Sequence, residues 1–254
     1  MNLGQMLGVA AAGLGAGVLN TVVGSGTLLT FPVLLAVGVP PVQANIANNI
    51  GLAPGSISGA ISYRSELSGP RWRVIACCTA AAAGGAMGAW LLLFLPARTF
   101  EAIVPVLILL AVLLLAIQPL VSRWSRRERD SRHGQVPRRE ILLIVSVLLA
   151  SLYGGYFGAA QGVILIAVMS LLIKQRLQSI NALKNVLQGV DNGVSALILT
   201  FASHVDWLIV GLLATGSVVG GKVGALVGRR VPDLWFRVVI VIVGVLGLVV
   251  FIRG

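Results

Sequence analysis

Apolar residues fill most of the chain in long runs, which glycine and asparagine interrupt more often than charge does. Runs close to the length of a membrane span include Val104–Ile117, Ile141–Leu152 and Val238–Ile252. A span needs roughly 20 mostly apolar residues, and backbone groups in lipid must bond within the chain, so such runs form helices. The pattern predicts an all-α polytopic membrane protein with helical segments at Leu3–Val37, Val42–Tyr63, Trp72–Leu95, Thr99–Leu120, Ile141–Ile173, Gln178–Thr200, Trp207–Gly228 and Leu234–Ile252.

The segments repeat. A shift of 136 residues aligns the two halves without a gap and pairs Gly26 with Gly162, Asn45 with Asn181, Asn49 with Asn185, Thr79 with Thr215, and Pro96 with Pro232. Chance matches would favour abundant residues such as leucine and valine, so matched glycine, asparagine and proline indicate a duplication. We expect a first membrane repeat at 1–118, a basic cytoplasmic linker at 119–136 and a second membrane repeat at 137–254.

Loop charge predicts how the two copies are oriented. The loop around Arg64 and Arg73 is basic whereas its equivalent around His204 is not, and Lys174 lies in a loop whose equivalent, Gly38–Pro41, is uncharged. Because cytoplasmic loops carry the excess of Lys and Arg, equivalent loops then lie on opposite sides and the repeats are inverted. A parallel arrangement with long first helices is the alternative. Ile141–Ile173 must leave and return to one side, either as a re-entrant hairpin or as two short broken spans.

Composition and charge agree with a membrane location. Hydrophobic residues make up 57% of the chain and charged residues 11%, whereas a soluble domain needs about a quarter charged residues. The formal net charge of +11 is concentrated in loops, above all in the arginine-rich linker, so it predicts topology and not nucleic-acid binding. We expect a multi-pass protein of the bacterial cytoplasmic (inner) membrane.

Glycine-rich breaks interrupt the first segment of each copy and are the first candidate binding elements. The first break contains Gly24, Ser25, Gly26 and Thr27, and the second contains Gln161 and Gly162. A helix that restarts after such a break presents unpaired N–H groups and the positive end of its dipole, which suits an anion. Close helix packing at small residues is the alternative interpretation.

Two helices carry a polar face at equivalent positions. Asn45 and Asn49 are four residues apart and share one face, with Asn48 beside them. The equivalent face of the second copy carries four polar residues: Asn181, Lys184, Asn185 and Gln188. Polar side chains at mid-membrane are costly and usually face the interior of the bundle, so these residues are candidates for substrate binding. Hydrogen bonding between helices is the competing explanation.

Charged residues within the predicted spans are few. Lys184 and Asp191 are seven residues apart on one helix face, and Lys222 lies in a glycine-rich segment. Two lysines and one acid favour an anionic substrate, and Asp191 and Lys222 are candidates for coupling transport to protons. A structural ion pair of Asp191 with either lysine is the alternative.

The residues Gly13-x-Gly15-x-Gly17, Gly24-Ser-Gly26-Thr-Leu-Leu-Thr-Phe-Pro32, Ala44-Asn45 and Asn48-Asn49 resemble those of the sulfite exporter TauE/SafE family of membrane permeases. The duplication and the chain length are similar too. The resemblance implies export of a small sulfur-containing anion, such as sulfite, sulfoacetate or another organosulfonate. Inverted repeats with interrupted helices are typical of secondary transporters, which work by alternating access.

Rival functions are weaker. A permease for a different small solute and a non-transporting membrane scaffold are the alternatives to an anion transporter. An intramembrane hydrolase would use Ser25 and His204, but the residue two before Ser25 is Val23 and not the glycine of a nucleophile elbow. We therefore expect no enzyme, no metal, no cofactor and no nucleic acid, with a small anion and the lipid bilayer as partners. A homodimer stays open.

Overall fold

The computed structural model describes residues 1–128 and 136–228, and this part of the chain contains helices and no strands. The helices are α1 Leu3–Val22, α2 Thr27–Ala36, α3 Pro41–Ser62, the short 3₁₀ helix η1 Arg64–Glu66, α4 Arg71–Phe94, α5 Ala97–Glu128, α6 Val136–Tyr156, α7 Gln161–Leu172, α8 Leu177–Ala202 and α9 Trp207–Val227. The all-α prediction is confirmed. The last predicted segment, Leu234–Ile252, and residues 129–135 of the predicted linker lie outside the described residues.

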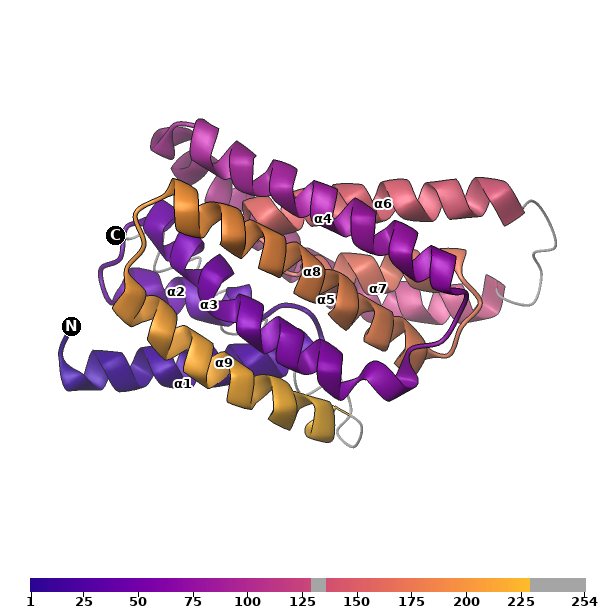
Figure 1. The fold of residues 1–254 in the computed structure, drawn as a ribbon, viewed down its shortest axis with the longest axis horizontal. Helices are drawn as coiled ribbons and strands as arrows, with labels where there is room; N and C mark the ends of the chain where they lie inside the picture. The colour runs from indigo at the N-terminus through magenta and orange to yellow at the C-terminus, as the bar shows by residue number, and fades with distance from the viewer. Residues whose placement is uncertain (129–135, 229–254) are drawn as a thin grey trace.

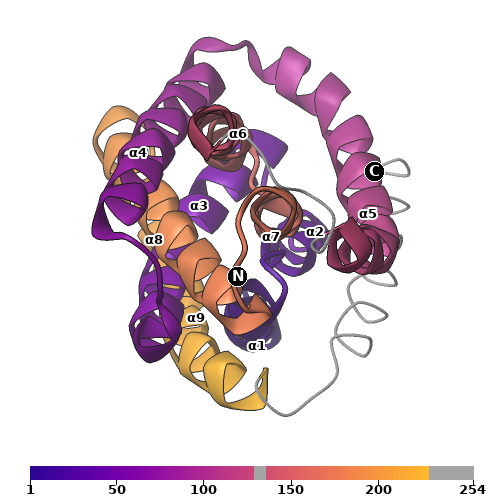
Figure 2. The same cartoon turned by 90° about the vertical axis from the view of Figure 1, so that its right-hand side faces the viewer.

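Five of these helices are long and apolar enough to cross a membrane, namely α1, α4, α5, α6 and α9. α3 and α8 are as long but carry the polar residues of the predicted binding faces. α2 and α7 are apolar and short, with 10 and 12 residues. In the end-on view of Figure 2, α2 and α7 lie inside the ring formed by the longer helices.

The helices of the two halves pack on each other reciprocally. α1 packs along α9 and α6 packs along α4, while α3 and α8 lie against each other and contact α9 and α4 respectively (Figure 1). Glycine permits the close approach: a Cβ atom on Gly17 would lie 2.3 Å from the Ser217 carbonyl oxygen, and one on Gly88 would lie 2.2 Å from that of Leu152. Each half is therefore completed by helices of the other half.

Basic residues gather at one end of the molecule, which we call the basic end: Arg64, Arg71, Arg73, Arg138, Arg139, Lys174 and Arg176. The Gln175 amide donates to the Ser68 carbonyl oxygen (2.8 Å), and the Arg73 Nε donates to Glu140 (2.9 Å). The start of the α6–α7 segment thus contacts the first turn of α4, and its end contacts the loop before α4, so this segment leaves and returns at the basic end.

The loops at the opposite end carry far less positive charge. Gly38, Val39 and Pro40 line one pocket with His204 and Asp206, beside the start of α9. α1 runs alongside α9, with Gly13 at Leu213 and Gly17 at Ser217, so α1 also starts at this end. The Gly38–Pro41 loop and the Lys174 loop, which the 136-residue shift makes equivalent, therefore lie at opposite ends of α8.

The Arg73–Glu140 ion pair joins the two halves at the basic end and yields a first prediction. Both side chains are partly exposed, at 18% and 13%, so solvent screens the pair. We expect a double-mutant cycle of Arg73→Ala and Glu140→Ala to give a coupling free energy of about 0.2–1 kcal/mol. Thermal unfolding in detergent measures it, and a coupling of several kcal/mol would show that the pair holds the halves together.

Candidate functional site

Two breaks in the helices cross in the interior of the protein. One separates α1 from α2 and contains Gly24, whose φ is +84°; the other separates α6 from α7 and contains Gly158, whose φ is +78°. The Gly162 N–H donates to the Gly24 carbonyl oxygen (3.0 Å), and a Cβ atom on Gly24 would lie 2.3 Å from the Gly162 Cα. Glycine is required here for both backbone conformation and contact.

The structure corrects the register of the repeat in this region. Three pairs of equivalent positions at the breaks are 134 residues apart. They are the last residues of α1 and α6, the positive-φ glycines Gly24 and Gly158, and the first residues of α2 and α7, Thr27 and Gln161. α3 and α8 start 136 residues apart, as do α4 and α9. α7 has two more residues than α2, so a gapless shift pairs Gly26 with Gly162 wrongly and conceals the equivalence of Thr27 and Gln161.

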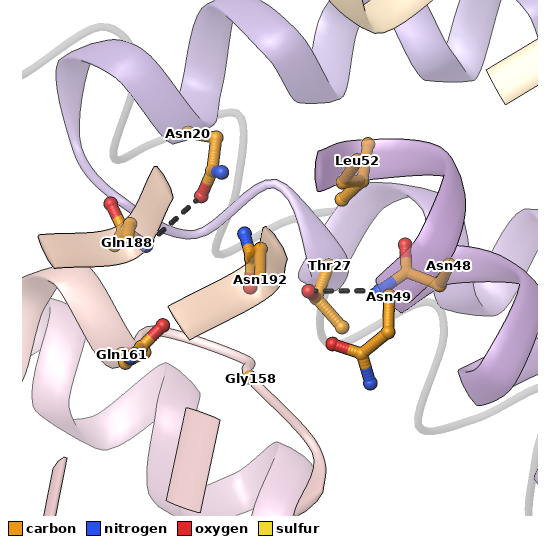
Figure 3. A pocket seen from close by; sticks show the side chains of 9 residues that line it. All are labelled: Asn20, Thr27, Asn48, Asn49, Leu52, Gly158, Gln161, Gln188 and Asn192. Carbon is orange, nitrogen blue, oxygen red and sulfur yellow. Dashed lines mark hydrogen bonds between the residues drawn. The ribbon is translucent and has the colours of Figure 1, made fainter. Parts of the chain in front are cut away.

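A small polar cavity lies where these first residues meet (Figure 3). It is lined by residues from α1, α2, α3, α7, α8 and the second break: Asn20, Thr27, Asn48, Asn49, Leu52, Gly158, Gln161, Gln188 and Asn192. No lining residue carries a formal charge. The cavity volume is about 10 Å³, close to what one water molecule needs. An oxyanion needs several times that space, so this conformation is closed around the site.

The asparagines of α3 have different roles. The Asn48 Nδ2 donates to the Thr27 Oγ1 (3.0 Å), and the Thr30 hydroxyl donates to the Asn48 Oδ1, so Asn48 ties α2 to α3. Asn49 is buried and lines the cavity, and its Nδ2 has no acceptor among the described residues. The Asn45 Nδ2 donates to the carbonyl oxygen of Tyr156 (2.7 Å), the last residue of α6. Of these three asparagines, Asn49 is thus the one whose amide nitrogen has no hydrogen-bond partner among the described residues.

A second polar network was missed from the sequence. The Asn20 Nδ2 and the Asn192 Nδ2 both donate to the Ser56 Oγ at 2.8 Å, and the Gln188 Nε2 donates to the Asn20 Oδ1 at 3.2 Å. Ser56 and Asn192 are 136 residues apart, so this bond joins equivalent positions where α3 meets α8. Asn192 follows Gln188 by one helical turn and so lies on the same face of α8. This spacing could have identified Asn192 from the sequence.

Lys184 is fully buried but does not line the cavity. Its Nζ donates to the carbonyl oxygens of Asn20 (2.8 Å) and Thr21 (3.0 Å), and the Asn185 Nδ2 also donates to Thr21 (3.2 Å). These carbonyls belong to the last turn of α1, where the helix dipole favours a cation. Lys184 therefore holds the end of α1 at the first break.

The other predicted residues are more dispersed. The Ser25 Oγ is fully buried and the Asn181 Oδ1 is buried at α8, and neither atom has a hydrogen-bond partner among the described residues. Lys222 is exposed on α9, and the structure does not bring it to the cavity. His204 is exposed in the loop before α9, so it is not placed beside Ser25. The described residues contain no group of three or more potential metal ligands.

Asp191 lies directly behind the cavity. Its side chain is fully buried, and its Oδ2 accepts a hydrogen bond from the Gln161 Nε2 (2.7 Å). Its Oδ1 has no hydrogen-bond partner among the described residues. The cavity is therefore a neutral amide-lined site with a buried carboxyl group one side chain away.

Comparisons with known proteins agree on the class of protein. A family model described as "Sulfite exporter TauE/SafE" matches residues 9–251. The chain is 25% identical over 230 residues to "Probable membrane transporter protein YfcA" of Escherichia coli (strain K12), covering 90% of this chain and 82% of the relative. It is 26% identical over 215 residues to a "Probable membrane transporter protein" of Haemophilus influenzae (strain ATCC 51907 / DSM 11121 / KW20 / Rd), covering 83% and 80%. No solved structure matches significantly.

Proposed function

The chain belongs to the sulfite exporter TauE/SafE family of multi-pass membrane transporters, and from this premise we propose that it exports a small sulfur-containing anion across the bacterial inner membrane. Sulfite, sulfoacetate and other organosulfonates are the substrates we favour. The observation that carries the proposal is the meeting of Thr27 and Gln161, the first residues of two half-helices, at one buried amide-lined cavity.

Backbone donors support an anionic substrate. The N–H groups of Ser25, Gly26 and Thr27 have no acceptor among the described residues. Such groups at the start of a helix bind anions, and half-helices in transporters direct their N-termini at anionic groups of the substrate. A sulfonate or sulfite would accept hydrogen bonds from these groups and from the Asn49 Nδ2, while Lys184, buried at the end of α1, supplies a nearby positive charge.

The proposed mechanism is alternating access, which the small size of the cavity in this conformation and the predicted repeat both support. Equivalent loops at opposite ends of α8 support inverted repeats, in which each first segment is re-entrant. In this proposal the two halves rock about the contact of α3 with α8, and the crossing breaks separate to open the cavity to one side and then to the other. Asn48 and Asn45 hold α2 and α6 in the closed arrangement.

Flux into proteoliposomes tests the proposal, with sulfite and sulfoacetate offered separately. Asn49→Leu removes a donor to a charged ligand, a loss of about 1.5–3 kcal/mol, so we expect the KM for the anion to rise roughly 10–150-fold. Gln43→Leu is the matched control, because Gln43 is an exposed amide on the same helix, and its KM should equal that of the unchanged protein.

Two results would contradict this function. Saturable flux of neither anion with the unchanged protein would favour a permease for a different small solute or a scaffold. Equal KM values for the two variants would show that the anion does not bind at the cavity beside Asn49.

A further inference from the structure

We propose that Asp191 and Gln161 form a proton-operated switch, in which protonation of Asp191 turns the Gln161 amide so that its N–H groups face the anion. The inference rests on the proposed anion site and adds to it a mechanism for coupling to protons. It starts from a buried carboxyl group whose contacts with the cavity pass through a single amide.

The Asp191–Gln161 pair occupies a space that the surrounding helices leave for it. A Cβ atom on Gly85 of α4 would lie 2.2 Å from the Asp191 Oδ1, and one on Gly154 of α6 would lie 2.3 Å from both the Asp191 Oδ2 and the Gln161 Nε2. Only glycine at these two positions admits the pair. The neighbouring Ser195 hydroxyl donates to the Gly85 carbonyl oxygen (3.0 Å), so it does not satisfy the carboxyl group.

The pair has two hydrogen-bonding arrangements. An ionised carboxyl group only accepts, so it binds the Gln161 Nε2, as the structure has it, and the Gln161 oxygen is directed toward the cavity (Figure 3). A protonated carboxyl group donates, so it binds the Gln161 oxygen once the amide has turned by half a rotation about its last bond. The Nε2 then presents its N–H groups to the cavity.

Both consequences of protonation favour an anion. The amide changes from an acceptor that repels the anion into a donor that binds it, and the negative charge behind the cavity disappears. Proton and anion therefore increase each other's affinity by the same factor, which linkage requires. One proton bound by Asp191 accompanies one anion and is released with it, so a monovalent anion crosses without net charge. Export then runs down the anion's own outward gradient, because an inward proton gradient opposes it.

Among the described residues, no other titratable group duplicates this role around Asp191. Gly85 and Gly154 lie beside its carboxyl group and Gln161 is hydrogen-bonded to it, and none of the three titrates. On the packed elements, α3 and α7 carry no titratable residue, and those of α4 are Arg71, Arg73, Cys77 and Cys78. On α6 the Tyr153 hydroxyl donates to the Ala159 carbonyl oxygen, and Tyr156 is the last residue of the helix. The other titratable residues of α6, Arg138, Arg139 and Glu140, lie at the basic end. On α8 the Lys184 side chain binds the end of α1.

Calorimetry of sulfite binding to the full-length protein in detergent tests the switch, because comparing buffers of different ionisation enthalpy counts the protons taken up. Experiments at several pH values also give the affinity. Because sulfite itself titrates near neutral pH, each result is compared with that of Asp191→Asn, which imitates the protonated group. We expect the unchanged protein to take up close to one proton more per anion than Asp191→Asn, and the ratio of the two affinities to change by about 5–150-fold between the acid and alkaline limits.

Glu101→Gln is the matched control, since Glu101 is an exposed acid on α5, and it should behave as the unchanged protein. Gln161→Met removes the amide and should weaken binding and reduce the pH dependence, which covers the case in which Asp191→Asn does not fold. In proteoliposomes an acid gradient should drive sulfite through the unchanged protein, whereas Asp191→Asn should support only exchange of sulfite for sulfite.

The outcomes separate the two proposals. Equal proton uptake by the unchanged protein and Asp191→Asn overturns the switch and leaves anion transport standing. An unaltered pH dependence in Gln161→Met does the same. Absence of binding and flux of both sulfite and sulfoacetate in the unchanged protein overturns the proposed function, and the switch falls with it.

Discussion

Replacing Gly24 with alanine is expected to abolish transport and to destabilise the protein. The residue has a φ of +84°, where a Cβ atom costs about 1–2 kcal/mol. That atom would also lie 2.3 Å from the Gly162 Cα, and backbone atoms on both sides cannot move aside as a flexible side chain can. Overpacking of this kind adds about 1–3 kcal/mol, so we expect a total destabilisation of roughly 2–5 kcal/mol.

Thermal unfolding in detergent and sulfite flux measure the two effects. Gly193→Ala and Gly211→Ala are matched controls, because a Cβ atom at either position would meet no atom within 4 Å. Both controls lie in helices, where alanine is favoured over glycine, so they should be as stable as the unchanged protein or more stable. Normal flux in Gly24→Ala would mean that the crossing of the breaks is not needed for transport.

Lys184→Met is expected to have the second large effect. Methionine fills most of the space of the lysine stem but leaves the carbonyl oxygens of Asn20 and Thr21 without the ammonium donor. The Thr21 carbonyl oxygen keeps its hydrogen bond from the Asn185 Nδ2, so the Asn20 carbonyl oxygen is the one left unsatisfied, at a cost of about 1–3 kcal/mol. Because the end of α1 leads into the first break, the variant should lose stability and transport together.

The control is Lys222→Met, which removes the same charge from an exposed position on α9 and should change stability by less than about 0.5 kcal/mol. Unfolding temperature and sulfite KM are to be compared for the two variants. A Lys184→Met protein with normal stability and a greatly raised KM would show that the ammonium group acts on the anion and not on α1.

Much of the fold could be predicted from the sequence, because the length of the apolar runs and the helical spacing of polar residues within them decide which segments are helices in a membrane. The polar faces of α3 and α8 were predictable for the same reason: Asn45, Asn49 and Asn185 recur at helical spacing. The sequence could not distinguish Lys184 from Lys222, since burial depends on which face of each helix packs against the other half. Nor could it reveal that the partners of Lys184 are backbone carbonyls, which have no residue signature.

The two-residue difference between α2 and α7 explains the largest error at the site. A gapless alignment works for α3, α4, α8 and α9 because their starts keep the same separation. At the breaks it pairs Gly26 with Gly162 because both are glycine, whereas the two glycines with the same backbone conformation are Gly24 and Gly158. Asn20 and Ser56 were overlooked because their partners, Asn192 and Gln188, lie in the other half of the chain.

The reciprocal packing of α1 on α9 sets a condition on biosynthesis. α1 ends at Val22 and α9 begins at Trp207, so at about 5–20 residues per second the ribosome completes the partner of α1 roughly 10–40 s later. During that interval the glycine face of α1 stands without its final neighbour in the bilayer or the insertion machinery. Neither half can mature first, and a nascent chain stopped before α9 should be a substrate for membrane quality-control proteases.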